Sequence, residues 1–292
     1  MKSKMLPLLA VGLALVGCLH AQTPAAPKLV LPQASPPATL KQQVGITDIE
    51  ISYSRPGMKG RKIFGGLVPY GEVWRTGANT ATKITFSTPV KFGGADVPAG
   101  TYELFTIPGE HEWTVIVHKN MSQWGSYAYD QKNDIVRVTA QATTLPTASE
   151  TFWIGLNDIR DTSATLNLTW EKTRVTVPLV VDTVGLLAPQ LEAAIKAQEK
   201  PNAMLLFSAA MFFYENDHNL PQALAWMNAA TAARPGQMWM IYRKGLILEK
   251  MGDKAAAKAA AEESLALTEK EKPGELREEY TRLNQALIAR VK

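Results

Sequence analysis

The sequence predicts an α+β protein in which an N-terminal antiparallel β-sandwich or barrel is followed by a C-terminal α-helical domain. Between residues 41 and 182, short runs alternate apolar and polar side chains and are separated by turn-forming residues. No helical period lies between these runs, which favours antiparallel pairing over a parallel sheet with crossover helices. From about Val184 the alternation ends and Ala, Leu, Glu, Lys and Met dominate, as in helices.

The first clear strand carries Ile49, Ile51 and Tyr53 alternating with polar residues, which is typical of one buried face. Strands are expected at residues 46–53, 83–87, 90–92, 101–107, 113–119, 135–142, 151–156, 165–171 and 174–181. Core positions are expected at the alternate residues Tyr102, Leu104, Trp113, Val115, Val117, Leu166, Leu168 and Trp170. Breakers such as Pro98-Ala99-Gly100 and Pro146 separate the strands. Eight or nine short strands of this kind indicate a sandwich or a barrel.

The helical part, residues 183–292, contains two similar helix pairs. Helices are expected at residues 187–199, 203–216, 220–234, 238–251, 254–268 and 273–290. Tyr214, Asn219 and Ala223 match Leu248, Asp253 and Ala257 at an offset of 34 residues, and this period resembles the tetratricopeptide repeat. Two units fall short of the three that a free-standing solenoid usually needs, so we expect these helices to pack on each other and on the sandwich.

The N-terminus, residues 1–21, has the features of a secretory signal peptide. Lys2 and Lys4 precede an apolar run at residues 5–16 that is too short to span a bilayer. Residues 15–18 resemble a lipobox, which would lipidate Cys18; the alternative is cleavage after Ala21, and both remain open. The protein is therefore expected to be exported, either to the periplasm or outer membrane as a lipoprotein or as a secreted protein.

Composition narrows the classes of function. The chain of 292 residues is long enough for two domains. Its formal charge of +4 falls to about +2 without Lys2 and Lys4, so bulk charge supports neither nucleic acid nor a membrane surface as a partner. Cys18 is the only cysteine, which excludes an intramolecular disulfide and a cysteine metal site. Residues 22–40, rich in Pro, Ala and Gln, are expected to form a flexible tether.

The stretch at residues 55–79 is the candidate functional loop. It holds five cations and one acid, Glu72, together with six glycines and two prolines that disfavour regular structure. Its apolar residues, including Phe64 and Trp74, argue against disorder. A second irregular stretch, residues 120–134, carries Trp124 and Tyr127 and is expected to close over the first, because a sandwich gathers its loops at two ends.

These loops carry a specific family resemblance. The quoted residues are Arg55-Pro56, Lys59-Gly60-Arg61, Ile63-Phe64-Gly65, Leu67-Val68-Pro69-Tyr70-Gly71, Val73-Trp74-Arg75-Thr76-Gly77-Ala78-Asn79, Pro98-Ala99-Gly100-Thr101-Tyr102, Ile107-Pro108, Trp113, Trp124-Gly125 and Tyr127. Over about residues 40–180 the chain resembles the DUF2911 family, secreted bacterial proteins of unknown function. The resemblance implies a fold and an envelope location, and it implies no chemistry.

Known catalytic and metal motifs are missing from the sequence. His111, His118 and His218 do not have metal-ligand spacing, so no metal is expected and each histidine is interpreted as structural or solvent-facing. No serine triad, phosphate loop or dinucleotide fingerprint is present, and no cofactor is expected.

The candidate site is a pocket for an anionic or carbohydrate ligand. Arginine forks suit carboxylate, sulfate or phosphate, and aromatic faces suit sugars. The candidate ligand-binding residues are Arg55, Lys59, Arg61, Tyr70, Trp74, Arg75, Asn79, Trp124, Tyr127 and Asp134. In the alternative interpretation, Arg55, Arg61 and Arg75 are structural clamps that pair with Asp130, Asp134 and backbone carbonyls.

Two functions follow from this site. The favoured one is a non-catalytic envelope protein whose β-domain binds a ligand while its helices contact a protein partner. The alternative is a hydrolase of a glycan or ester that uses Asp130, Asp134 or Glu72 as acid and base. The first is preferred because the candidate site has no evident nucleophile or base.

Overall fold

A computed structural model describes residues 31–119 and 121–292 of the chain. The expected signal peptide, its lipobox and Cys18 lie outside the described residues. Of the expected tether, residues 22–40, residues 22–30 lie outside them too. Within the part that is described, no helix combines the length and the apolar character that a membrane crossing needs.

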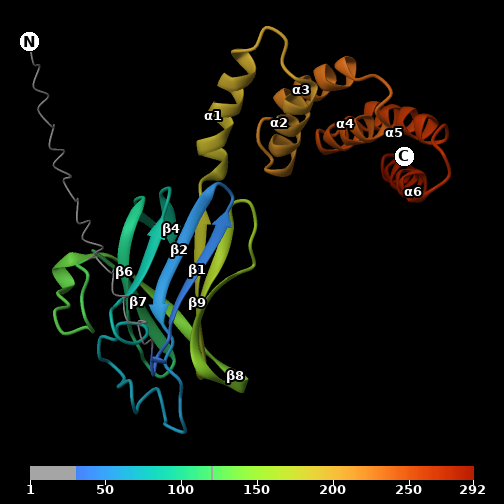
Figure 1. Ribbon diagram of the computed structural model, residues 1–292. Coiled ribbons are helices and arrows are strands. Elements are labelled where there is room, and N and C mark those ends of the chain that lie inside the picture. Colours follow the sequence, from blue (N-terminus) through green and yellow to red (C-terminus); the bar gives the residue numbers. More distant parts are fainter. Residues whose placement is uncertain (1–30, 120) are drawn as a thin grey trace, which may run out of the picture. The chain divides into compact units, whose positions relative to one another are not determined.

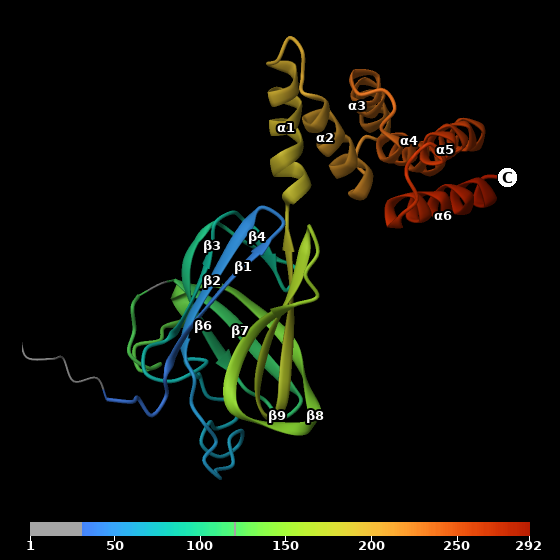
Figure 2. The same ribbon diagram turned by 45° about the vertical axis from the view of Figure 1, so that its right-hand side comes forward.

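Nine antiparallel strands form one sheet in the order β1-β2-β3-β6-β7-β8-β9-β4-β5 (Figure 1). Their bounds are β1 (Pro37–Val44), β2 (Thr47–Ser54), β3 (Thr82–Phe86), β4 (Val90–Phe92), β5 (Ala95–Val97), β6 (Gly100–Ile107), β7 (Glu112–Lys119), β8 (Asp134–Asn157) and β9 (Ser163–Val181). β8 pairs with β7 through Gln141 and with β9 from Ala142 onward, so this one strand carries the sheet around a bend. Figure 2 shows the resulting curvature. β1 and β5 are the two edge strands, each paired on one side only, so the curved sheet is not closed.

The sheet surrounds one apolar core. Every core position expected from the alternation is buried, from Tyr102 in β6 to Trp170 in β9. The core also takes in residues of the candidate loop, among them Ile63, Phe64 and Trp74. The apolar residues that argued against disorder therefore anchor the loop to the sheet.

The expected strand boundaries need three corrections. β1 was missed, and it begins at Pro37, within the expected tether. It is an edge strand with one face exposed, so it needs few of the β-branched and aromatic residues that mark a strand. The left-handed Gly45 (φ 57°), in the turn between β1 and β2, is the signal that could have revealed it. The short strand β5 was also missed.

The third correction concerns β8 and β9, because each of them joins two expected strands. Pro146 does not end β8. It lies between Thr144 and Ser149, where the pairing of β8 with β9 shifts in register. A proline has no backbone N–H to donate, and at such an irregularity the ladder does not require one.

Six helices follow β9, with one short 3₁₀ helix, η1 (Gln131–Asn133), earlier in the chain. They are α1 (Thr183–Lys196), α2 (Ala203–Glu215), α3 (Leu220–Ala233), α4 (Met238–Lys250), α5 (Lys254–Thr268) and α6 (Glu275–Arg290). Asn219 caps α3 and Asp253, one period of 34 residues later, caps α5. Ala223 and Ala257 are both buried at the matching position in the helix that follows. The α2–α3 and α4–α5 pairs are therefore copies of one tetratricopeptide-like unit.

Candidate functional site

The loop at residues 55–79 connects β2 to β3 and is a folded structure. Its tip is closed by backbone bonds, since the N–H groups of Leu67 and Val68 donate to the carbonyls of Lys62 and Ile63. Farther along, Trp74 exchanges two backbone hydrogen bonds with Thr106 of β6, with N···O distances of 2.7 and 2.9 Å. These bonds fix the segment that carries the conspicuous pair Trp74 and Arg75.

Trp74 belongs to the core. Its ring is 9% exposed and stacks on Trp170, with 5.9 Å between ring centroids and an interplanar angle of 19°. Phe64 and Phe152 pack edge-on against it. Its indole Nε1 donates to the Gly77 carbonyl over 3.0 Å. The expectation that Trp74 offers a flat face to a sugar is therefore not supported. Other rings of the protein already pack against its indole, and its N–H already has a carbonyl acceptor.

A cleft of about 270 Å³ opens beside this aromatic cluster. We call it the loop cleft. Its lining includes Arg61, Glu72 and Arg75, an apolar wall from Leu67, Val68, Pro69 and Val73, and the edges of Trp74 and Trp170. The cleft thus combines two cations, one acid and an apolar surface within the first expected loop.

Arg75 is the most unusual residue of the loop cleft. Its side chain is half-buried, and its Nε atom is buried without a hydrogen-bond partner. No ion pair within the described part of the chain involves Arg75. A buried donor of a charged group normally has a partner, because leaving it unpaired costs about 1–3 kcal/mol or more. Arg75 therefore has unused hydrogen-bonding capacity beside an open cleft.

Arg55 and Arg61 are clamps on backbone carbonyls. Arg55 Nε donates to the carbonyl of Phe152 over 3.1 Å. Arg61 donates from Nε to Met58 and from Nη2 to Gly57, over 2.9 and 2.7 Å. The alternative interpretation, in which these arginines are structural and bind backbone carbonyls, is thus correct for Arg55 and Arg61.

The same interpretation is wrong about carboxylates. Asp134 pairs with Arg137 over 2.8 Å, and the side chain of Asp130 accepts from the backbone N–H of Lys132. Neither acid lines the loop cleft, so Glu72 is the only one of the three acids of the hydrolase hypothesis that does.

Other expected site residues serve the loop rather than line the cleft. Asn79, at a left-handed φ of 61°, donates from Nδ2 to Ser54 Oγ and to the Ser35 carbonyl. Lys59 has an exposed side chain, and its backbone N–H donates to Glu150. Tyr70 is exposed, and its ring covers Gly65.

The second loop does meet the first, as expected. The backbone N–H of Gly125 donates to the Asn79 carbonyl, and that of Ala81 donates to the Gln123 carbonyl, each over 3.0 Å. Trp124 and Tyr127 nevertheless point to solvent, at 64% and 86% exposure, and neither lines the loop cleft. The two loops are therefore joined by backbone contacts, while the exposed aromatics lie apart from the cleft.

Asp134 belongs to a separate cluster. It accepts the Tyr129 hydroxyl over 2.7 Å and one nitrogen of Arg137 over 2.8 Å. Burial, followed by the hydrogen bond to Asp134, raises the pKa of Tyr129 to about 12. This cluster positions the end of the second loop on β8.

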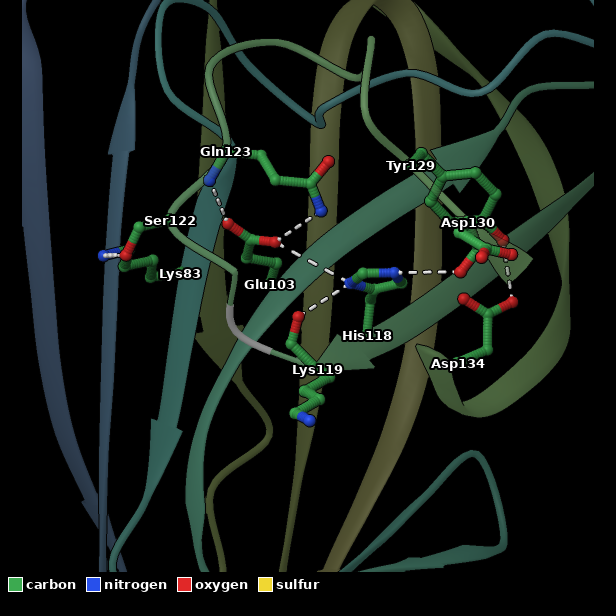
Figure 3. A network of polar contacts seen from close by, with 9 residues as sticks. All are labelled: Lys83, Glu103, His118, Lys119, Ser122, Gln123, Tyr129, Asp130 and Asp134. Atoms are coloured by element: carbon green, nitrogen blue, oxygen red, sulfur yellow. Dashed lines mark hydrogen bonds and ion pairs between the residues drawn. The ribbon is translucent and has the colours of Figure 1, made fainter. Parts of the chain in front are cut away.

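Sequence reasoning missed a buried polar network beneath the second loop (Figure 3). Glu103 and His118 are both fully buried and are paired neighbours in β6 and β7. Glu103 accepts the backbone N–H and the side-chain amide of Gln123, over 2.7 and 3.0 Å. His118 lies 3.7 Å from Glu103 and contacts the carbonyls of Lys119 and Asp130. The structural interpretation of His118 is confirmed, although its partners were not foreseen.

One signal could have indicated this network. Phe105 and Ile116 stand on the face of β6 and β7 opposite the main core, yet both are buried in a second small cluster with Ala81. Apolar residues on both faces of a strand indicate that both faces are covered. A charged residue such as Glu103 on the same face should therefore be buried as well.

Comparison with known proteins adds a family and no chemistry. The family model described as a protein of unknown function, DUF2911, matches residues 35–179. The match begins just before β1 and ends within β9, so it covers the sheet and both loops. No curated protein and no solved structure matches the chain.

Proposed function

We propose that this chain, whose residues 35–179 belong to the DUF2911 family of proteins of unknown function, is a binding protein that holds a small organic anion in the loop cleft. The observation that carries the proposal is Arg75, whose buried Nε has no partner while its side chain lines the cleft. A carboxylate, sulfate or phosphate oxygen is the acceptor that a guanidinium binds best.

The rest of the cleft supports an anion with a small apolar part. Arg61 adds a second positive charge, and its two bonds to loop carbonyls hold its guanidinium in place. Leu67, Val68 and Val73 supply an apolar wall. The volume of about 270 Å³ is just below the range of about 300–1,000 Å³ for drug-sized ligands, which favours a small molecule.

A carbohydrate is less well supported than an organic anion. Sugar rings stack on exposed aromatic faces, whereas Trp74 and Trp170 are stacked on each other in the core. The exposed aromatics Trp124 and Tyr127 lie outside the cleft.

Binding without catalysis fits the lining best. Among the described residues that line the cleft, Glu72 is the only carboxylate, and no histidine, cysteine or lysine is present. Glycoside hydrolysis generally needs two carboxylates that flank the bond, and ester hydrolysis needs a nucleophile with a base.

The test uses the indole N–H groups as site-specific reporters. The full chain, labelled with ¹⁵N, would be titrated separately with sulfate, phosphate, acetate and benzoate. We expect at least one anion to shift the Trp74 and Trp170 signals saturably, while Trp226 and Trp239 in the helical part stay unchanged. If none of the four anions does so, the proposal is overturned.

Arg75→Met tests the role of the arginine, with Arg160→Met in the β8–β9 turn as a control of equal charge. Arg75→Met should weaken binding about tenfold or more, the effect of losing one charge-assisted hydrogen bond. Its stability should stay close to wild type, because the lost Nε donor was unpaired. A loss of about 3–5 kcal/mol would instead identify Arg75 as part of a buried ion pair.

The proposal also includes the cellular location of the protein and a role for its helical region. The charged start, the apolar run and Cys18 support export to the envelope, as a lipoprotein or after cleavage at Ala21. Mass spectrometry of the mature N-terminus distinguishes them: an acylated Cys18 supports the lipoprotein, a free Gln22 supports secretion, and an intact Met1 contradicts export. The tetratricopeptide-like helix pairs support a protein partner for the helical region.

A further inference from the structure

We infer that Glu103 is a positioning residue for the loop cleft, because it anchors the second loop, which in turn holds the Arg75 guanidinium in place. The inference deepens the proposed function and rests on it. Glu103 touches no part of the cleft itself. It acts through Gln123 and Gly125.

The anchor is a buried carboxylate that is shared by two elements. Both oxygens of Glu103 accept from Gln123, one from the backbone N–H and one from the side-chain amide. A fully buried carboxylate with two such bonds holds its partner segment in one position, since breaking them leaves a charge unpaired in the interior. Gln123 is consequently the residue through which Glu103 holds the second loop to the sheet.

Opposite charges surround this anchor in a row across four strands. The register places Lys83 of β3 opposite Glu103 of β6, Glu103 opposite His118 of β7, and His118 opposite Asp134 of β8. The Lys83 ammonium reaches Ser122 of the second loop over 3.3 Å, and Asp134 holds Tyr129 and Arg137. Basic and acidic residues thus alternate along the row, and they contact four residues of the second loop, Ser122, Gln123, Tyr129 and Asp130 (Figure 3).

His118 packs beside Glu103, and each of its ring nitrogens contacts a backbone carbonyl. Its Nδ1 lies 2.7 Å from the Lys119 carbonyl, and its Nε2 lies 3.2 Å from the Asp130 carbonyl. One carboxylate oxygen of Glu103 lies 3.7 Å from His118 Nδ1, so the ring also fills the space beside the anchor.

The link from Gln123 to Arg75 is short. Two residues beyond Gln123, Gly125 bonds through its N–H to Asn79, in the segment that carries Arg75. Gly125 is buried directly against the guanidinium, so that a Cβ added at this glycine would lie 2.9 Å from Arg75 Nη1. Displacement of the second loop therefore removes one wall of the space that the guanidinium occupies.

Glu103→Gln is the direct test, with Glu112→Gln, an exposed acceptor on β7, as the matched control. A glutamine amide replaces one of the two acceptor oxygens with an N–H donor, so Glu103→Gln removes the negative charge and one of the two contacts with Gln123 while the side-chain shape is kept. The first readout needs no ligand: the ¹H–¹⁵N signal of Arg75 Nε–H should shift in Glu103→Gln and stay unchanged in Glu112→Gln. The second readout is sulfate affinity, which should fall about tenfold in Glu103→Gln alone.

The outcomes separate this inference from the proposed function. If sulfate and the other three anions fail to bind the wild type, the proposed function fails, while the Arg75 Nε–H signal still tests positioning. If Glu103→Gln does not fold, Gln123→Met removes only the amide contact and should shift the same signal to a smaller extent. An unchanged Arg75 signal in a folded Glu103→Gln or Gln123→Met protein overturns the inference.

Discussion

The rings of Trp74 and Trp170 lie nearly parallel, 5.9 Å apart, so a loop residue is built into the centre of the β-domain core. Trp74 also contacts Phe64 and Phe152, and its indole N–H is satisfied by Gly77. The loop at residues 55–79 is therefore folded together with the sheet, and core side chains form one wall of the cleft beside Trp74.

Trp74→Ala should destabilise the protein by about 3–5 kcal/mol, the usual cost of truncating a buried aromatic side chain. Trp124→Ala is the matched control, because Trp124 is exposed and its loss should change stability by about 0.5 kcal/mol or less. Urea unfolding of the full chain measures both. Similar small losses at the two positions would contradict the core role of Trp74.

Gly125→Ala should reduce the free energy of anion binding by more than it reduces the free energy of unfolding. Gly125 has a left-handed φ of 74°, and an added Cβ would press on both Tyr127 and Arg75. Gly94→Ala is the control, since Gly94 has a φ of 89° with open space around it. Both changes carry the same kind of backbone cost, about 1–2 kcal/mol. Only Gly125→Ala should also shift the Arg75 Nε–H signal, and equal signals in the two variants would contradict the contact.

The two loops show how far sequence reasoning reaches. The apolar anchors of residues 55–79 were recognised because a segment with so many large apolar residues seldom stays unfolded. Whether Trp74 faces a ligand or the core depends on Trp170, which is distant in sequence, so local pattern could not decide it. The same holds for Arg55, whose partner is a backbone carbonyl of β8.

Long-range register explains the remaining omissions. Glu103 and His118 become neighbours only when β6 and β7 pair in one particular register. A one-residue slip would send every side chain of a strand to the other face, and sequence alternation alone does not select the partner strand. The helical repeat was accessible, by contrast, because its caps recur at a constant spacing along the chain.

Asn219→Ala should cost more than Asp253→Ala, although the two residues cap equivalent helices. Each loses a bond to the first turn, worth about 1 kcal/mol. Asn219 also has a left-handed φ of 38°, which alanine tolerates poorly, whereas Asp253 has a φ of −81°. Hydrogen exchange at the amides of Gln222 and Ala256 measures the local effect. Asn219→Gly, which relieves the backbone cost, should recover part of the loss; no recovery would contradict this argument.

Tyr129 should make the stability of the protein fall in strong alkali. Its pKa is raised from 10.0 to about 12, chiefly by burial and next by the hydrogen bond to Asp134. A group whose pKa is raised in the folded state contributes stability that is fully present below the unfolded value. This contribution is lost as the pH rises from about 10 to about 12.

Tyr129→Phe should remove this part of the pH dependence while its ring still packs against Phe105 and His118. Tyr127 lies on the same loop and is exposed, so Tyr127→Phe serves as the control for general alkaline unfolding. The check is urea unfolding of the three proteins across this pH range, together with the ultraviolet absorbance of the phenolate. A Tyr129 phenolate that forms near pH 10 in the folded protein would contradict its burial against Asp134.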